Sequence, residues 1–98
     1  MQLEYVSTAD RASIPLYWFC AEQTRATLLL QPALGIQARL YLQLAQGLAE
    51  RGYATAVLEQ RGHGLSSFSP GYSCNFSFRE TLDYDLPAAL NWIATEAP

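Results

Sequence analysis

The spacing of apolar residues changes several times along the chain, and each change marks the start of a new predicted strand or helix. Every second side chain of residues 14–20 falls on one face, which predicts a strand with that face on a core. The face consists of Ile14, Leu16, Trp18 and Cys20. A short, partly β-branched run at 3–7 precedes this strand across a polar turn at 8–12, so we expect an antiparallel hairpin at a sheet edge.

Two more apolar runs predict strands on either side of a helix. Residues 26–30 are almost continuously apolar, which is typical of a strand covered on both faces. Over 37–51 the spacing becomes helical and predicts an amphipathic helix. Its apolar stripe consists of Leu40, Tyr41, Leu44, Ala45 and Leu48. A second buried strand at 53–58 completes a strand–helix–strand unit, and we expect its two strands to run parallel.

Three residues mark the interior and the end of this first helix. Gly52 stands where a left-handed carboxy-terminal cap is wanted, and Arg51 beside it is placed to interact with the helix dipole. Gly47 lies in the helix interior, where glycine costs about 1 kcal/mol against alanine. We therefore expect close packing against the sheet at Gly47.

A second helical pattern, at 80–97, follows a loop rich in glycine, serine and aromatic residues. Pro87 is tolerated only near a helix start, so firm helix is expected from about Asp85, with Asp83 or Asp85 as the N-cap. The apolar side is formed by Leu82, Leu86, Ala89, Leu90 and Ile93. The order of elements predicts an α/β fold, with one helix on each face of the sheet or both helices on the same face.

Composition narrows the classes of protein that this fold can represent. The 98 residues, half of them hydrophobic, suffice for one core and not for two domains. Six arginines, no lysine and nine acidic residues give a net charge of -3, and no basic run could neutralise a line of phosphates. Nucleic acid is thus not expected as a partner. Neither a membrane-spanning stretch nor a signal-peptide pattern is present, so we expect a cytoplasmic protein.

Cysteine and glycine patterns exclude further kinds of site. Cys20 and Cys74 lie far apart with no cluster of other ligands, so we expect reduced thiols and neither a metal site nor a disulfide framework. No glycine-rich phosphate loop follows the first parallel strand, which excludes a nucleotide-binding unit. No cofactor is expected.

Three segments in order carry a resemblance to a known family. Residues 59–66, Glu-Gln-Arg-Gly-His-Gly-Leu-Ser, resemble the Asp-x-Arg-Gly-His-Gly-x-Ser loop that follows the fourth strand in many α/β-hydrolases. The helix and strand start at 41–53 and the helix at 85–93 are similar to the family's patterns at the same spacing. The resemblance, which covers 26 to the end, implies the amino-terminal part of an α/β-hydrolase fold, a single partial domain over 1–98 that stops before the nucleophile elbow.

No catalytic residue is assigned within the chain. His63 is the only histidine, but in α/β-hydrolases the order nucleophile, acid, histidine places the catalytic histidine far later, so we interpret His63 as a loop residue. None of the seven serines, Ser66 included, stands in a Gly-x-Ser-x-Gly elbow. Cys74 has no histidine near it in sequence and no activating context, and is interpreted as structural.

The resemblance implies one contribution to catalysis. In the family the loop after the third strand donates a backbone N–H to the oxyanion hole, and by position the amide of Leu34 corresponds to that donor. Pro32 and Ala33 replace the family's His-Gly there, and a simple strand-to-helix turn is the alternative. Glu59 replaces the usual Asp and is expected to accept hydrogen bonds from loop amides or to pair with Arg61. The aromatic set Phe68, Tyr72, Phe76 and Phe78 either packs the loop onto the core or lines a pocket.

Two functions follow as hypotheses. The first is part of a serine-type hydrolase for ester, thioester or amide bonds of a small-molecule substrate, inactive as these residues alone. The alternative is a non-catalytic binding or interaction module derived from the same fold. Because the strand at 54–58 is expected at an uncovered sheet edge, we expect it to pair with other chains.

Overall fold

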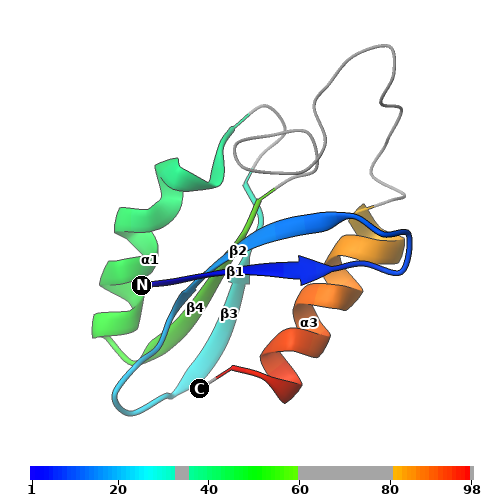
Figure 1. The fold of residues 1–98 in the computed structure, drawn as a ribbon. Coiled ribbons are helices and arrows are strands. Elements are labelled where there is room, and N and C mark those ends of the chain that lie inside the picture. The colour runs from blue at the N-terminus through cyan, green and yellow to red at the C-terminus, as the bar shows by residue number, and fades with distance from the viewer. Residues whose placement is uncertain (33–35, 60–80, 98) are drawn as a thin grey trace.

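The predicted alternation of strands and helices is confirmed in a computed structural model, which describes residues 1–32, 36–59 and 81–97 (Figure 1). The fold is α/β, as expected. Its elements are β1 (Gln2–Ser7), β2 (Ser13–Phe19), β3 (Ala26–Leu30), the 3₁₀ turn η1 (Ala38–Tyr41), α1 (Leu42–Glu50), β4 (Tyr53–Leu58), the π-helical turn η2 (Thr81–Asp85) and α3 (Leu86–Thr95).

The amino-terminal strands form the expected antiparallel hairpin. β1 and β2 pair in register from Gln2 opposite Trp18 to Ser7 opposite Ser13. Thr8 closes the turn twice, because its amide donates to the carbonyl of Ala12 at 3.0 Å and its hydroxyl accepts from the amide of Ala12 at 2.9 Å. The turn that the polar residues predicted is therefore closed by hydrogen bonds between its first and last residues.

The order of strands in the sheet differs from the expectation for β4. The order is β1-β2-β4-β3, with β3 parallel to β4 and β2 antiparallel to β4. β4 is therefore central, and the prediction that residues 54–58 form an uncovered edge is wrong. The cause is β2, which pairs with β1 along one edge and with β4 along the other, from Leu16 opposite Leu58 to Phe19 opposite Thr55.

β3 pairs with the side of β4 that faces away from β2, and it forms one edge of the described sheet. Leu28, Leu29 and Leu30 are half-buried, and the first two residues of the strand are exposed. The expectation of a strand covered on both faces is thus not met within the described residues. An apolar run identifies a strand that suits a core, but it does not reveal which neighbours the strand has.

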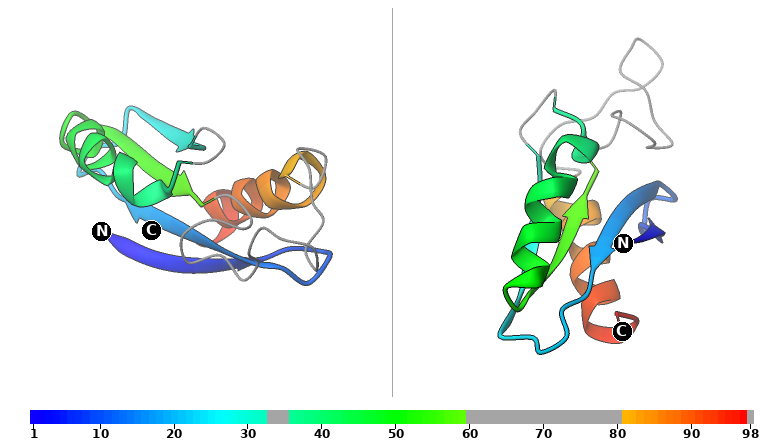
Figure 2. Two further views of the ribbon diagram at one scale, coloured as in Figure 1. Left: turned by 90° about the horizontal axis from the view of Figure 1, so that it is seen from above. Right: turned by 90° about the vertical axis from the view of Figure 1, so that its left-hand side faces the viewer.

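One helix covers each face of the sheet, which settles the alternative left open by the sequence (Figure 2). On one face, Leu16 and Trp18 of β2 pack with Leu58 of β4 and Ala89 of α3. The opposite face joins α1 to the same two strands through Tyr17, Phe19, Ala45, Ala49 and Val57. Alternate residues of β2 and β4 thus serve two separate cores, so both strands are buried on both faces.

The apolar stripe predicted for the first helix is only partly correct. Leu40 and Leu44 are 61% and 55% exposed, whereas Ala45 and Ala49 face the core with Ala38. The first turn is 3₁₀, with three residues per turn, so Leu40 is rotated away from the position that a uniform α-helix would give it. The small alanines let the helix lie close to β4, and the leucines are left on its flank.

The second helix shows a similar exchange of core residues. Leu90, predicted on the buried side, is 57% exposed, and Trp92 packs there with Ala89, Leu86 and Ile93. Trp92 meets Trp18 of β2 edge to face, with 5.6 Å between the ring centroids and 71° between the planes. An aromatic pair in this geometry contributes about 0.5–1.5 kcal/mol beyond its buried area.

The predicted helix ends are confirmed at Gly52, and α3 begins where expected, with Asp85 at the N-cap position. Gly52 has φ +94° and donates its amide to Ala49 at 3.1 Å, as a left-handed cap does. Asp85 has helical dihedral angles and makes no capping hydrogen bond through its side chain, because η2 leads directly into α3. Asp83 lies inside η2 and is not the N-cap. Pro87 is in the first turn of α3, where its missing N–H is harmless.

Candidate functional site

The carboxyl ends of β3 and β4 lie side by side, which is where parallel sheets place their ligands (Figure 1). The register pairs Leu30 at the end of β3 with Val57, one residue before the end of β4. Pro32, which follows β3, is fully buried, and so is Glu59, which follows β4. The chain that leaves each strand is therefore held against the core at this edge.

Glu59, at the end of β4, is hydrogen-bonded to η1 and to β2. Its carboxylate Oε2 accepts from the amide of Ala38 at 2.7 Å, and its own amide donates to the carbonyl of Pro15 at 2.9 Å. Ala38 begins the 3₁₀ turn η1, so the negative charge sits where free helical N–H groups and the helix dipole favour it. Of the two expectations for Glu59, acceptance from a backbone amide is met at Ala38, and pairing with Arg61 lies outside the described residues.

The electrostatics at this edge follow from the burial of Glu59. It is 1% exposed, and Tyr17 on β2 is buried as well. Burial raises the pKa of Tyr17 above its ordinary value of 10.0, and the negative charges of Glu59 and then of Tyr5 raise it further. At this end of the sheet a buried carboxylate thus accepts a hydrogen bond from the backbone amide of Ala38.

Gln31 adds a polar group that the sequence reasoning missed. It follows β3 directly, and its amide nitrogen Nε2 is buried without a hydrogen-bond partner among the described residues. A buried donor without a partner is costly, so this amide is a candidate contact for whatever lies beyond the strand end. A polar residue immediately after an apolar strand was the signal in the sequence that could have identified it.

Most residues singled out from the sequence lie outside the described residues. These are Leu34, Arg61, His63, Ser66, Cys74 and the aromatic set Phe68, Tyr72, Phe76 and Phe78. The structure does fix the chain on both sides of Leu34, because Pro32 is buried and Ala38 is bonded to Glu59. The assignment of Leu34 as an oxyanion-hole donor stays a prediction.

The part of the chain that the structure describes gives no sign of a metal centre. Within 1–32, 36–59 and 81–97, no three histidine, cysteine or acidic side chains lie together. Cys20 is a free, exposed thiol. No helix in these ranges is long and apolar enough to cross a bilayer.

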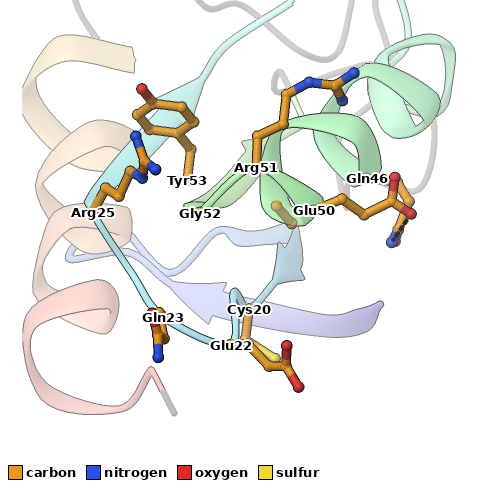
Figure 3. A pocket seen from close by; sticks show the side chains of 10 residues that line it. Cys20, Glu22, Gln23, Arg25, Gln46, Glu50, Arg51, Gly52 and Tyr53 are labelled. Carbon is orange, nitrogen blue, oxygen red and sulfur yellow. Dashed lines mark hydrogen bonds between the residues drawn. The ribbon is translucent and has the colours of Figure 1, made fainter.

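A pocket of about 860 Å³ lies at the opposite end of the strands, where β3 and β4 begin (Figure 3). It is lined by Cys20, Glu22, Gln23, Arg25, Gln46, Ala49, Glu50, Arg51, Gly52 and Tyr53. Most of these side chains are polar and exposed, and none was predicted to take part in chemistry. A ligand site in an α/β sheet is expected at the carboxyl ends of the strands, so we place the candidate site there and not in this pocket.

Comparison with known proteins supports the fold. No protein-family model and no curated protein sequence matches the chain. Among solved structures, the α/β-hydrolase GrgF from Penicillium sp. sh18 matches with a TM-score of 0.79 and 18% identity, over 98% of this chain and 32% of GrgF. The esterase EaEST from Exiguobacterium antarcticum has a TM-score of 0.75 and 15% identity, over 95% and 32%. The bottromycin epimerase BotH has a TM-score of 0.71 and 18% identity, over 93% and 34%.

These likenesses confirm the fold that the resemblance implied. The chain has the fold of the amino-terminal part of α/β-hydrolases, with a mixed sheet of four strands in the described residues. It spans about a third of the length of the solved structures that it matches.

Proposed function

We propose that the chain is the amino-terminal part of a serine-type hydrolase that cleaves ester, thioester or amide bonds of a small-molecule substrate. Residues 1–98 are then a single partial domain that is inactive alone, because no nucleophile elbow is encoded in them. The proposal includes a cytoplasmic location and needs neither metal, cofactor nor nucleic acid.

The observation that carries the proposal is the bond between Glu59 and Ala38. It ties the end of β4 to the first turn that follows β3, at the edge where α/β folds bind ligands. The chain segment between Pro32 and Ala38, which contains Leu34, is thereby held at both ends. A backbone amide fixed in advance is what an oxyanion hole requires, since a donor that does not reorganise stabilises developing charge best.

In this scheme the chain supplies part of a site and not the reacting groups. A serine attacks the substrate carbonyl, the amide of Leu34 donates to the oxyanion that forms, and water hydrolyses the acyl-enzyme. A single such donor contributes on the order of 3 kcal/mol to the transition state. The serine, acid and histidine of the reaction come from residues other than these.

The test is the reactivity of the chain itself. The purified polypeptide should hydrolyse a nitrophenyl ester no faster than buffer and should not be labelled by a fluorophosphonate. Hydrolysis well above background that is abolished by Ser66→Ala or His63→Ala would show that a complete catalytic set is present and contradict the proposal. In addition, the coding sequence that follows Pro98 should encode a strand ending in Gly-x-Ser-x-Gly within about 20 residues.

The second candidate function is a non-catalytic interaction module. It is favoured by the half-buried leucines of the β3 edge and by the exposed Leu40 and Leu44 of the helical segment. The likeness to BotH, named an epimerase, also shows that structures of this fold are not all named as hydrolases. A folded chain that melts in one sharp cooperative transition and stays unreactive, with no nucleophile elbow encoded downstream, would favour the module.

A further inference from the structure

The pocket at the start of β3 and β4 is separate from the candidate site and is formed by the described chain alone. Its walls are the connection between β2 and β3, the end of α1 and the start of β4 (Figure 3). β4 has a neighbouring strand on each side, and a strand added beside β3 would lie on the side of β3 that faces away from β4. The volume of about 860 Å³ is within the range of small-molecule sites.

Arg25 is anchored in this pocket by its backbone and by the stem of its side chain. Its amide donates to the carbonyl of Gly52 at 2.7 Å. The stem packs on Gly52, where an added Cβ would lie 3.1 Å from Cγ and 3.3 Å from Cδ of Arg25. Among the described residues, no hydrogen bond or ion pair involves the guanidinium of Arg25. A positioned cation with unused N–H donors is therefore available to a ligand.

Arg51, the residue before Gly52, adds a second guanidinium to the same pocket. Its Nη1 donates to the carbonyl of Gly47 at 3.0 Å, in the last turn of α1. This bond orients the side chain and leaves further N–H groups of the guanidinium for a ligand. Figure 3 shows Arg25 and Arg51 on either side of Gly52 and Tyr53. Two positive charges thus lie at this part of the pocket.

Two carboxylates line other parts of the pocket. Glu22 belongs to the connection between β2 and β3, and Glu50 is the last residue of α1. Within the described ranges, neither glutamate is ion-paired to an arginine. Figure 3 shows the carboxylate of Glu22 on the side away from Arg51 and that of Glu50 beside Gln46, whose amide donates to it at 3.4 Å. Positive and negative groups therefore line the pocket separately.

We propose that this pocket binds a small zwitterion that carries a free carboxylate and a free ammonium group, as an amino acid or a short peptide does. A lone anion would be attracted by the two arginines and repelled by the two glutamates, and a lone cation would meet the reverse. A zwitterion places each of its charges against groups of opposite sign. Its carboxylate accepts from Arg25 and Arg51, whose planar N–H groups match two oxygens, and its ammonium group donates to Glu22 and Glu50.

This binding goes beyond the proposed hydrolytic function, because the pocket and the candidate site lie at opposite ends of the strands. It uses neither Leu34 nor Glu59. A failure of the zwitterion to bind would therefore leave the proposed function untouched, and the reverse also holds.

Titration of the purified chain with alanylalanine, followed by amide resonances in two-dimensional NMR, tests the proposal. We expect saturable shifts at Arg25 and Gly52. The N-acetylated dipeptide keeps only the carboxylate and the dipeptide amide keeps only the ammonium group, so each should bind at least fivefold more weakly. Free alanine, titrated in parallel, distinguishes an amino acid from a peptide as the tighter ligand. No saturable shift, or equal binding of a blocked form, would overturn the proposal.

Matched variants test the residues. Arg25→Gln should weaken the binding of alanylalanine at least fivefold, whereas Arg39→Gln removes an exposed arginine from η1 and should leave it unchanged. Glu22→Gln should weaken it in the same way, with Glu96→Gln, at an exposed position after α3, as its control. Far-UV circular dichroism verifies that all four variants are folded. Equal weakening by a pocket variant and its control would show attraction by net charge alone and contradict the proposal.

Discussion

Glu59 is a buried carboxylate that accepts a hydrogen bond from a backbone amide. Removing this carboxylate should lower the stability of the fold. Glu59→Ala leaves the amide of Ala38 buried without its acceptor, so we expect the free energy of unfolding to fall by about 1–3 kcal/mol. Glu59→Gln keeps a carbonyl oxygen and should lose less. Urea denaturation measures both. Glu50→Ala, at an exposed position on α1, is the control and should stay within about 0.5 kcal/mol of the wild type.

Tyr17 should make the protein sensitive to alkaline pH. Its pKa is raised, first by burial and then by the charge of Glu59, so the folded state keeps the proton that the unfolded state loses near pH 10.0. The contribution is fully present below the unfolded pKa and is lost as the pH rises through the folded pKa. Denaturation in urea at a series of pH values should show a loss above about pH 10 that is smaller in Tyr17→Phe.

The two causes of the Tyr17 shift are separable by a second variant. Glu59→Gln removes the charge and leaves the burial, so the alkaline loss should decrease without disappearing. If Tyr17→Phe and the wild type lose stability in parallel at high pH, Tyr17 is not the group responsible.

At the scale of elements, α1 contains a glycine that nothing in the packing requires. The expectation of close packing at Gly47 is wrong for the part of the chain that the structure describes, where an added Cβ would meet only the guanidinium of Arg51, at 3.6 Å. Gly47→Ala should therefore raise the free energy of unfolding by about 0.5–1 kcal/mol through helix propensity. Thermal and urea unfolding measure the change.

Gly52 provides the contrast to Gly47 on the same helix. A Cβ there would meet the side chain of Arg25 at 3.1 Å and the carbonyl of Gln23 at 3.2 Å, on a backbone with φ +94°. Gly52→Ala should destabilise the fold by more than Gly47→Ala stabilises it. Equal effects of the two changes would contradict the assignment of the cap.

The sequence predicted the type of nearly every element and missed which helical side chains are buried. Period two identified Leu16 and Trp18 correctly, because a strand has only two faces. In α1 the choice between Leu44 and Ala45 depends on how closely the helix approaches the sheet and on the 3₁₀ turn before it. Both are properties of the packing, which the spacing of apolar residues along the helix does not encode.

At the scale of the whole molecule, the centre of the sheet should be its most protected part. β2 and β4 have partners on both sides, whereas β1 and β3 have one each in the described sheet. Amide hydrogen exchange should therefore be slowest in β2 and β4. Exchange in β4 as fast as in β1 would place β4 at an edge.

The candidate site was only partly predictable, because it depends on the order of strands in the whole sheet. The parallel pairing of β3 and β4 and the role of Glu59 as an acceptor followed from residues that are adjacent in sequence to predicted strands. The central place of β4 depended on β2, which belongs to the amino-terminal hairpin. Strand order is decided by such long-range pairing, and no local pattern encodes it.

The contact between Trp18 and Trp92 gives the molecule an optical reporter of its own. The chain contains two tryptophans, and both belong to this one contact between β2 and α3. Intrinsic fluorescence, excited where only indole absorbs, therefore senses the seating of α3 on the sheet and little else. A departure of α3 that left the hairpin and β4 in place would be visible in the emission spectrum before circular dichroism recorded any loss of strand.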